Sequence, residues 1–279
     1  MYNSVKFSVL LSVYTIENPT FLRESIESIY AQTLLPNEVL LVEDGSLSNE
    51  LYAVIEDFMA KYDTLRVIPL KEKQGLGPAL NIGLEACKYD IVARMDTDDI
   101  SKPNRFEKQI EFMESHPEID LCSAWVDEFE GDVNNVISQR KIPENHKDIF
   151  EYGKKKCPVN HPVTVYRKNS VLKAGGYGKY PEDYLLWVKM LTSGCKFYGF
   201  QESLLWYRLS KDFIKRRGGL TYAWHELQDQ VKFYKMGYTN LFQFLLNATI
   251  RFTVRLIPSP VRSLTYRFLL RKKYQKTNS

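Results

Sequence analysis

The sequence has few cysteines, and none of them stands in a pairing pattern. The four cysteines, Cys87, Cys122, Cys157 and Cys195, lie far apart, and no two of them form a Cys-x-x-Cys pair. This spacing argues against a structural zinc site and against a disulfide framework. We therefore expect free, buried thiols in a reducing compartment.

The sequence also lacks a hydrophobic leader and an uninterrupted membrane-spanning run. Residues 1–6 lead directly into an apolar strand, without the hydrophobic segment of a signal peptide. The apolar stretch at residues 241–257 contains Arg251 and Arg255 and is followed by prolines, which makes it a poor membrane span. We expect the protein to lie inside the cell, in the cytoplasm.

No internal repeat, low-complexity linker or strong overall charge is present. The net charge is +4 and 44% of the residues are hydrophobic, as in a globular protein with a substantial core. The charges are uneven, because acidic clusters lie early in the chain and residues 211–276 are rich in lysine and arginine. We expect a main domain at residues 1–215 and a basic helical region at residues 216–279 that faces an anionic surface; nucleic acid is not an expected partner.

What the sequence does contain is an alternation of apolar strands and amphipathic helices. Strands are predicted at residues 7–13, 39–42, 65–70 and 91–94, with helices after Asn18 and at residues 51–62 and 78–87. Repeated units of this length predict an α/β fold with an open, mostly parallel sheet and helices on both faces. After a further helix at residues 103–114 the pattern is less regular, which indicates a mixed and partly antiparallel half.

Three carboxylates follow the last of these parallel strands. Asp96, Asp98 and Asp99 come directly after the apolar residues 91–95, at the end of the sheet where ligands bind. Packed carboxylates repel one another and need a cation, and hard oxygen ligands suit Mg²⁺ or Mn²⁺. Asp98 is the strongest single metal-ligand candidate, while a solvated acidic loop or a helix cap is the alternative.

Other polar residues lie at strand ends or helix starts, and each has a structural alternative. Asp44 either contacts a base or a ribose or makes an Asp-Gly turn, and Tyr14 either stacks on a base or joins the core. His161 either binds a phosphate or a metal or is structural. Glu182 and Asp183 begin an apolar helix, where Asp183 is either a general base or a cap.

A glycine-containing segment and a basic segment are two further candidates for contact with a ligand. Residues 75–83 do not match the Gly-x-Gly-x-x-Gly spacing of a dinucleotide loop, so we discount NAD; the small residues let a helix start close to the sheet, near a ligand. The basic residues Arg208, Lys215, Arg216 and Arg217 either bind phosphates or form a solvated face.

Taken together, these segments resemble the inverting family-2 glycosyltransferases of the GT-A fold over about residues 7–210. The matching motifs occur in the family's order: Ser8-Val-Leu-Leu-Ser-Val-Tyr14, Ser25-Ile-Glu-Ser-Ile-Tyr-Ala-Gln-Thr33, Glu43-Asp-Gly-Ser46, Gly77 to Gly83, Asp96-Thr-Asp-Asp99, Gly175-Gly-Tyr177 and Glu182-Asp183. The resemblance implies a Rossmann-like, mostly parallel central sheet flanked by helices, with a C-terminal helical extension.

The resemblance also implies roles for the candidate residues. Tyr14 and Asp44 would contact the nucleoside, Asp96 and Asp98 would hold ribose, diphosphate and a Mn²⁺ or Mg²⁺ ion, and Asp183 would be the catalytic base. Glu182 and His161 are assigned with them to the sugar nucleotide. Thr15 stands where many members have asparagine, a difference that concerns base recognition. The Gln-x-x-Arg-Trp motif of processive synthases is absent, which favours an enzyme that adds a single sugar.

Within the family, the chain looks like bacterial enzymes that build O-antigen, capsule or exopolysaccharide repeat units. The resemblance implies transfer of a hexose or N-acetylhexosamine from a UDP-sugar to a sugar on polyprenyl diphosphate, with a β-1,3 linkage, by a peripheral protein at the inner face of the plasma membrane. The basic, amphipathic residues 261–273 would bind anionic lipid, or else pack on the main domain or on another copy of the chain. An aspartyl phosphatase and a non-catalytic scaffold are the alternatives.

Overall fold

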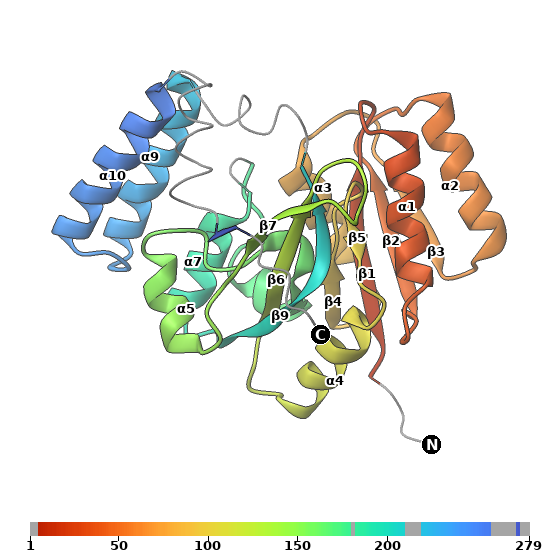
Figure 1. Cartoon of the computed structure of the whole chain (residues 1–279), viewed down its shortest axis with the longest axis horizontal. Coiled ribbons are helices and arrows are strands. Elements are labelled where there is room, and N and C mark those ends of the chain that lie inside the picture. The colour runs from red at the N-terminus through yellow and green to blue at the C-terminus, as the bar shows by residue number, and fades with distance from the viewer. Residues whose placement is uncertain (1–4, 180–181, 210–218, 258–271, 274–279) are drawn as a thin grey trace.

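A mixed β-sheet runs through the middle of the molecule, with helices on both of its faces (Figure 1). The computed structural model describes residues 5–179, 182–209, 219–257 and 272–273. The strand order is β10-β7-β6-β8-β4-β1-β2-β3, and β9 pairs with β5 and β6. The predicted α/β class is therefore confirmed.

The first half of the chain forms the parallel part of the sheet. Its elements are β1 (Phe7–Val13), α1 (Pro19–Tyr30), β2 (Glu38–Glu43), α2 (Asn49–Lys61), β3 (Leu65–Pro69), α3 (Leu76–Ala86) and β4 (Ile91–Arg94). β1 pairs in parallel with β2 and β4, and β2 pairs in parallel with β3. Every strand and helix predicted here is present, with ends shifted by a residue or two.

The second half is mixed, as the irregular pattern indicated. Its elements are β5 (Ile100–Ser101), α4 (Arg105–Ser115), β6 (Leu121–Phe129), β7 (Val136–Arg140), α5 (His146–Gly153), the 3₁₀ turn η1 (His161–Val163), β8 (Val165–Arg167), α6 (Lys168–Lys173), α7 (Tyr184–Thr192), β9 (Phe197–Arg208) and β10 (Lys272–Lys273). β8 is antiparallel to β4 and β6, β7 is antiparallel to β6 and β10, and β9 runs parallel to β6 and antiparallel to β5.

Side-chain alternation along the central strands builds one core on each face of the sheet. Val9 and Leu11 of β1 pack with α1, α2 and α4, whereas Leu10 packs with α3 and α7. Trp187 of α7 is completely buried in the second core. The two cores hold the carboxyl ends of the parallel strands in a fixed arrangement.

A helical hairpin follows the main domain and corresponds to the predicted C-terminal extension. It consists of α9 (Leu220–Lys235) and α10 (Leu241–Leu256), the blue helices in Figure 1. Phe233 of α9 joins the second core, where its ring lies 4.8 Å from that of Tyr184 in α7. The predicted boundary at residue 215 and most of the basic stretch at 261–273 lie outside the described residues. Within the described part of the chain, no helix is long and apolar enough to cross a membrane.

Candidate active site

The candidate residues of the first half meet at one edge of the sheet. Because β1, β2 and β4 are parallel, Tyr14, Asp44 and the acidic loop at residues 96–99 all leave the sheet at its carboxyl edge. The amide of Asp44 donates to the carbonyl of Val13 at 2.8 Å, which ties the ends of β1 and β2 together. This is the edge where ligands bind to such sheets.

The acidic loop brings three carboxylates together. One oxygen from each of Asp96, Asp98 and Asp99 lies within 4.8 Å of the others. Asp99 is completely buried, and its Oδ2 has no hydrogen-bond partner among the described residues. An oxygen-only donor set with an unpartnered carboxylate oxygen fits Mg²⁺ or Mn²⁺. Asp99 thus adds a third candidate ligand to the predicted pair, Asp96 and Asp98.

The pKa values of this loop reflect burial first and the crowding of like charges second. Burial and the neighbouring Asp96 raise the pKa of Asp98 to about 6. Burial, together with the charges of Asp98 and Asp96, raises the pKa of Asp99 well above its ordinary value. A cation bound between the three carboxylates would relieve both the repulsion and the desolvation.

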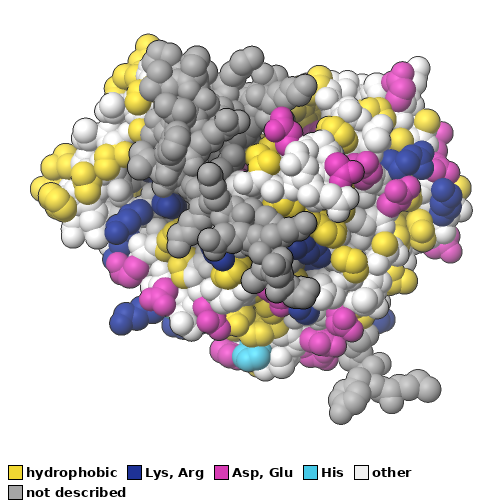
Figure 2. All heavy atoms as spheres, in the orientation of Figure 1, with side chains coloured by type: hydrophobic (Ala, Val, Ile, Leu, Met, Phe, Trp, Pro, Cys, Tyr) yellow, Lys and Arg dark blue, Asp and Glu magenta, His cyan; other side chains and the backbone are white. Residues whose placement is uncertain are grey.

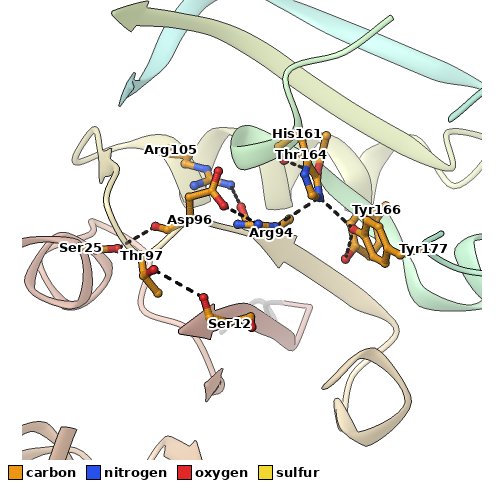
Figure 3. Close-up of polar contacts among 10 residues, drawn as sticks. All are labelled: Ser12, Ser25, Arg94, Asp96, Thr97, Arg105, His161, Thr164, Tyr166 and Tyr177. Atoms are coloured by element: carbon orange, nitrogen blue, oxygen red, sulfur yellow. Dashed lines mark hydrogen bonds and ion pairs between the residues drawn. The ribbon is translucent and has the colours of Figure 1, made fainter. Parts of the chain in front are cut away.

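The buried side chain of Arg94 binds the carboxylate of Asp96 from the protein interior (Figure 3). Arg94, the last residue of β4, is completely buried and forms an ion pair with Asp96. Its Nε donates to Nε2 of His161 at 3.3 Å, and that ring nitrogen lies 3.3 Å from the hydroxyl of Tyr177. Burial and the charge of Arg94 lower the pKa of His161 well below its ordinary value, so the ring is neutral. The network links the acidic loop to the segment before α7.

His161 therefore takes part in a protein-internal network. Its Nε2 faces Arg94 and Tyr177, and the side chain is buried. The predicted contact of His161 with a phosphate or a metal stays a prediction, and it would have to use the other ring nitrogen or a rearranged network.

The backbone of the acidic loop is fastened by three side chains, all drawn in Figure 3. Arg105 of α4 donates to the carbonyl of Arg94 at 2.6 Å. Ser25 of α1 donates to the carbonyl of Asp96 at 3.0 Å, and Thr97 donates to the carbonyl of Ser12 at 3.5 Å. The carboxylates are therefore presented on a preorganised backbone.

Arg208 fastens the same loop from its other end. Its amide donates to Oδ1 of Asp99 at 2.8 Å, and its Nε donates to the carbonyl of Asp98 at 2.8 Å. The guanidinium carbon lies 4.0 Å from the centre of the Phe21 ring and 4.6 Å from that of Phe129. Arg208 is thus buried and is not part of a solvated basic face; Lys215, Arg216 and Arg217 lie outside the described residues.

The two predicted nucleoside contacts lie beside the loop before α3. The carboxylate of Asp44 accepts from the amides of Gln74 at 2.6 Å and Gly75 at 3.0 Å. The ammonium of Lys73 lies 4.3 Å from the centre of the Tyr14 ring. Asp44 therefore shapes the loop, and the nucleoside contacts of both residues stay predictions.

The start of α3 packs directly against the segment that carries Glu182. A Cβ added to Gly77 would lie 1.8 Å from the carbonyl oxygen of Gly178 and 3.2 Å from the Cβ of Glu182. Asn81 donates to the carbonyl of Tyr177 at 2.9 Å and accepts from its amide at 2.8 Å. Gly77 thus permits close approach to another loop of the protein. The predicted approach to the sheet occurs at Gly83, where an added Cβ would lie 2.5 Å from Cδ1 of Leu10 and 2.7 Å from Cγ2 of Val42.

Glu182 and Asp183 stand at the amino end of α7. Asp183 caps the helix: its Oδ1 accepts from the amide of Tyr184 at 2.8 Å, while its Oδ2 lies 3.5 Å from Sγ of Cys157. Burial, then the charge of Asp183 and more weakly that of Asp96, raise the pKa of Glu182 to about 7. The Arg94–His161–Tyr177 network and the hydrogen bond from the amide of Gly178 to the carbonyl of Glu182 at 3.2 Å connect this pair to the acidic loop.

Sequence reasoning missed Arg94, Asn81 and Cys157. Only Arg94 had a usable signal, because a charged residue at the end of the apolar run Ile-Val-Ala-Arg must find a partner when it is buried. The partners of Asn81 and Cys157 are far away in sequence, so no local pattern pointed to them.

Comparison with known proteins relates the chain to one family of glycosyl transferases. The sequence profile of glycosyl transferase family 2 matches residues 8–176. The chain is 38% identical over 269 residues to the UDP-Gal:alpha-D-GlcNAc-diphosphoundecaprenol beta-1,3-galactosyltransferase of Escherichia coli, covering 96% of this chain and 97% of that protein. It is 39% identical over 266 residues to the amylovoran biosynthesis glycosyltransferase AmsE of Erwinia amylovora, covering 93% of this chain and 97% of the relative.

Solved structures share the fold. S. aureus TarS 1–349 in complex with UDP-GlcNAc superposes with a TM-score of 0.66 at 15% identity, covering 95% of this chain and 76% of that one. The mannosyltransferase PcManGT from Pyrobaculum calidifontis, in complex with GDP-Man and Mn²⁺, superposes with a TM-score of 0.63 at 15% identity, covering 95% and 73%.

Proposed function

The chain belongs to glycosyl transferase family 2, and on that premise we propose that it moves a hexose or N-acetylhexosamine from a UDP-sugar to a sugar carried on polyprenyl diphosphate. It is a nucleotide-sugar glycosyltransferase by family. The E. coli relative supports the finer statement, because its name specifies a UDP-sugar donor and a lipid-diphosphate acceptor and the match spans nearly both chains. The proposed linkage is β-1,3, in the assembly of a bacterial surface polysaccharide.

The observation that carries this proposal is the meeting of two acidic groups at the carboxyl edge of the sheet. The Asp96–Asp99 loop provides oxygen ligands, and the Arg94–His161–Tyr177 network connects that loop to the segment that leads into the Glu182–Asp183 pair. The Asp96–Asp99 loop suits a metal ion with the donor diphosphate, and the Glu182–Asp183 pair suits removal of a proton from an acceptor hydroxyl.

Asp96 and Asp98, joined by Asp99, are the residues that would hold Mn²⁺ or Mg²⁺. When bound, the ion would neutralise the donor diphosphate and the charge that develops on it as it leaves. Arg94 and Arg208 keep these carboxylates in place from inside the protein.

Asp183 is the proposed general base. Its Oδ1 is held by the amide of Tyr184, which leaves Oδ2, beside the weak donor Cys157, to accept a proton from the acceptor hydroxyl. The hydroxyl attacks the anomeric carbon on the side opposite the diphosphate, so an α-linked donor yields a β-linked product.

The test of this function is transfer of labelled sugar. UDP-Gal, UDP-Glc, UDP-GlcNAc and UDP-GalNAc are each incubated with GlcNAc or GalNAc on a lipid diphosphate, with Mn²⁺ or EDTA, and the linkage of the product is determined by NMR. Asp183→Asn should retain the fold and UDP binding and lose about 10²-fold or more in kcat. Near-normal turnover by this variant would exclude Asp183 as the base.

The outward face of α10 supports a peripheral position at a membrane. This helix is polar toward the protein and apolar toward solvent: Arg255 is buried against Glu226, whereas the side chains of Phe242 and Ile250 are 74% and 52% exposed. Figure 2 shows the hydrophobic side chains gathered over this end of the molecule. An exposed apolar helix face of this kind is typical of a helix that lies in a lipid interface.

Vesicle flotation tests the membrane position. Replacing Phe242 and Ile250 by glutamine should abolish co-flotation with anionic vesicles without a change in net charge. The control replaces two exposed polar residues of α2, Glu56→Gln and Lys61→Gln, also without a change in net charge, and should leave flotation unchanged. Equal flotation of all three proteins would count against this face as the lipid contact. No specific observation favours the phosphatase or the scaffold.

A further inference from the structure

The turn that follows α5 lies between the proposed base and α10. It consists of Lys154, Lys155 and Lys156, and it is directly followed by Cys157. We infer that this turn, with Lys141 beside it, binds the diphosphate of the lipid-linked acceptor and so presents the acceptor sugar to Asp183. This inference rests on the proposed function and names a subsite of it.

One end of the turn is attached to the base. Cys157 lies 3.5 Å from Oδ2 of Asp183, and the hydroxyl of Tyr184, the first residue of α7, donates to the carbonyl of Gly153 at 2.7 Å. Consecutive Cα atoms are about 3.8 Å apart, so the Cα of Lys156 lies within about 10 Å of the carboxylate that would take the acceptor proton.

The other side of the turn is attached to the inward face of α10. Asn247 donates to the carbonyl of Lys154 at 2.7 Å, and Arg251 donates to the carbonyl of Lys155 at 2.7 Å. The opposite face of the same helix carries the exposed apolar side chains. A lipid chain beside α10 and a sugar at Asp183 would therefore have their connecting diphosphate near this turn.

The positive charges of the turn suit the binding of a diphosphate. Lys154 is ion-paired with Glu151, but the side chains of Lys155 and Lys156 are exposed. Tyr152 connects the backbone of a third lysine to the turn. Its hydroxyl donates to the carbonyl of exposed Lys141 at 3.5 Å, and the ammonium of Lys156 lies 5.6 Å from the centre of its ring. The ammonium of Lys141 lies 4.0 Å from the centre of the Trp125 ring, and it would have to turn from that ring to reach a phosphate.

The acidic groups of the site would repel the acceptor diphosphate, and the lysines of the turn would offset this repulsion. The site beside it holds the carboxylates of residues 96–99 and of Glu182 and Asp183, which repel an anionic acceptor. Lysine ammonium groups bind phosphate oxygens through charge-assisted hydrogen bonds and offset that repulsion. An acceptor with a neutral linker would gain nothing from them.

The experiment compares two acceptors with the same sugar and the same alkyl chain, one joined by a diphosphate and the other by a neutral ether. Transfer is measured in neutral detergent without phospholipid, for the unaltered chain and for Lys155→Ala/Lys156→Ala. The double variant should raise KM for the diphosphate acceptor by about tenfold, as expected for a lost charge-assisted hydrogen bond. KM for the ether acceptor and for the UDP-sugar should not change.

A matched control is Lys88→Ala/Lys147→Ala, which removes two exposed lysines before β4 and at the start of α5. It should leave every constant unchanged. Equal effects of the Lys155/Lys156 variant on both acceptors, or no effect on either, would overturn the inference. An effect seen only when anionic vesicles are added would also overturn it, because the lysines would then bind lipid headgroups. No transfer by the unaltered chain from any UDP-sugar would instead refute the proposed function.

Discussion

Replacing Arg94 by methionine tests how the acidic loop is held together. Arg94 and Asp96 form an ion pair in which the side chain of Arg94 is 1% exposed and that of Asp96 is 30% exposed. Methionine keeps most of the volume of the side chain and removes its charge. The substitution therefore leaves Asp96 without its internal counter-charge and His161 without the donor to its Nε2.

The expected loss of stability follows from this burial. Removing one partner of a fully buried pair costs about 3–5 kcal/mol. Water can solvate the exposed part of Asp96, so we expect about 3 kcal/mol, which corresponds to a decrease of about 6 °C or more in Tm for a chain of this size.

Divalent metal should reverse part of this loss. If Asp96 is a metal ligand, Mn²⁺ takes over the compensation that Arg94 provided, and removal of the competing positive charge tightens the binding of Mn²⁺ by about tenfold, or about 1.4 kcal/mol. The increase in Tm on adding a fixed Mn²⁺ concentration should therefore be larger in Arg94→Met than in the unaltered protein.

Arg66→Met is the matched control. Arg66 pairs with the buried carboxylate of Glu38 at 2.5 Å, at the opposite end of β2 from the site. This variant should also lose stability, but its gain from Mn²⁺ should equal that of the unaltered chain. A Tm for Arg94→Met within about 2 °C of the unaltered value would refute the burial argument, and equal gains from Mn²⁺ in both variants would refute Asp96 as a ligand.

Three further predictions concern the neighbouring segments. The pKa of Glu182 is raised from 4.5 to about 7, so the folded chain holds this proton more tightly and its free energy of unfolding should fall as pH rises between these values. In EDTA, urea titrations of Glu182→Gln should lack that fall of about 3 kcal/mol, and parallel pH profiles of the two proteins would contradict it. Asn81→Ser removes both hydrogen bonds to Tyr177. It should lower kcat by about tenfold, which corresponds to the energy of one lost hydrogen bond, and leave the affinity for UDP, measured by calorimetry, unchanged. A loss of UDP affinity without a loss of kcat would argue for a role in the donor site. Glu226→Gln weakens the pairing of buried Arg255 and should cost about 3 kcal/mol in urea unfolding, whereas an unchanged midpoint would show that the pair is not needed to dock α10.

Most of the parallel half could be predicted from residue patterns. Strands such as β1 are covered on both faces, so their sequences are continuous apolar runs. The helices between them show an apolar stripe and begin at recognisable caps; at the start of α1, for example, the side chain of Asn18 accepts a hydrogen bond from the amide of Thr20. The antiparallel half was harder to predict. β7 and β8 are short and α5 has few buried side chains, so their periodicity is weak, and their pairing depends on distant strands.

The candidate site also has a part that could be predicted from the sequence and a part that could not. The sequence by itself determined that carboxylates follow β4 and stand at the start of α7, because strand ends and helix caps are local features that a pattern of residues specifies. It also indicated the family through the order of these motifs. Only the tertiary structure decided which groups meet them: Arg94 with Asp96 and His161, and Arg208 with the backbone of the acidic loop. Such contacts join residues from different elements, and they are set by how the two cores pack those elements against the sheet, so no local pattern contains them.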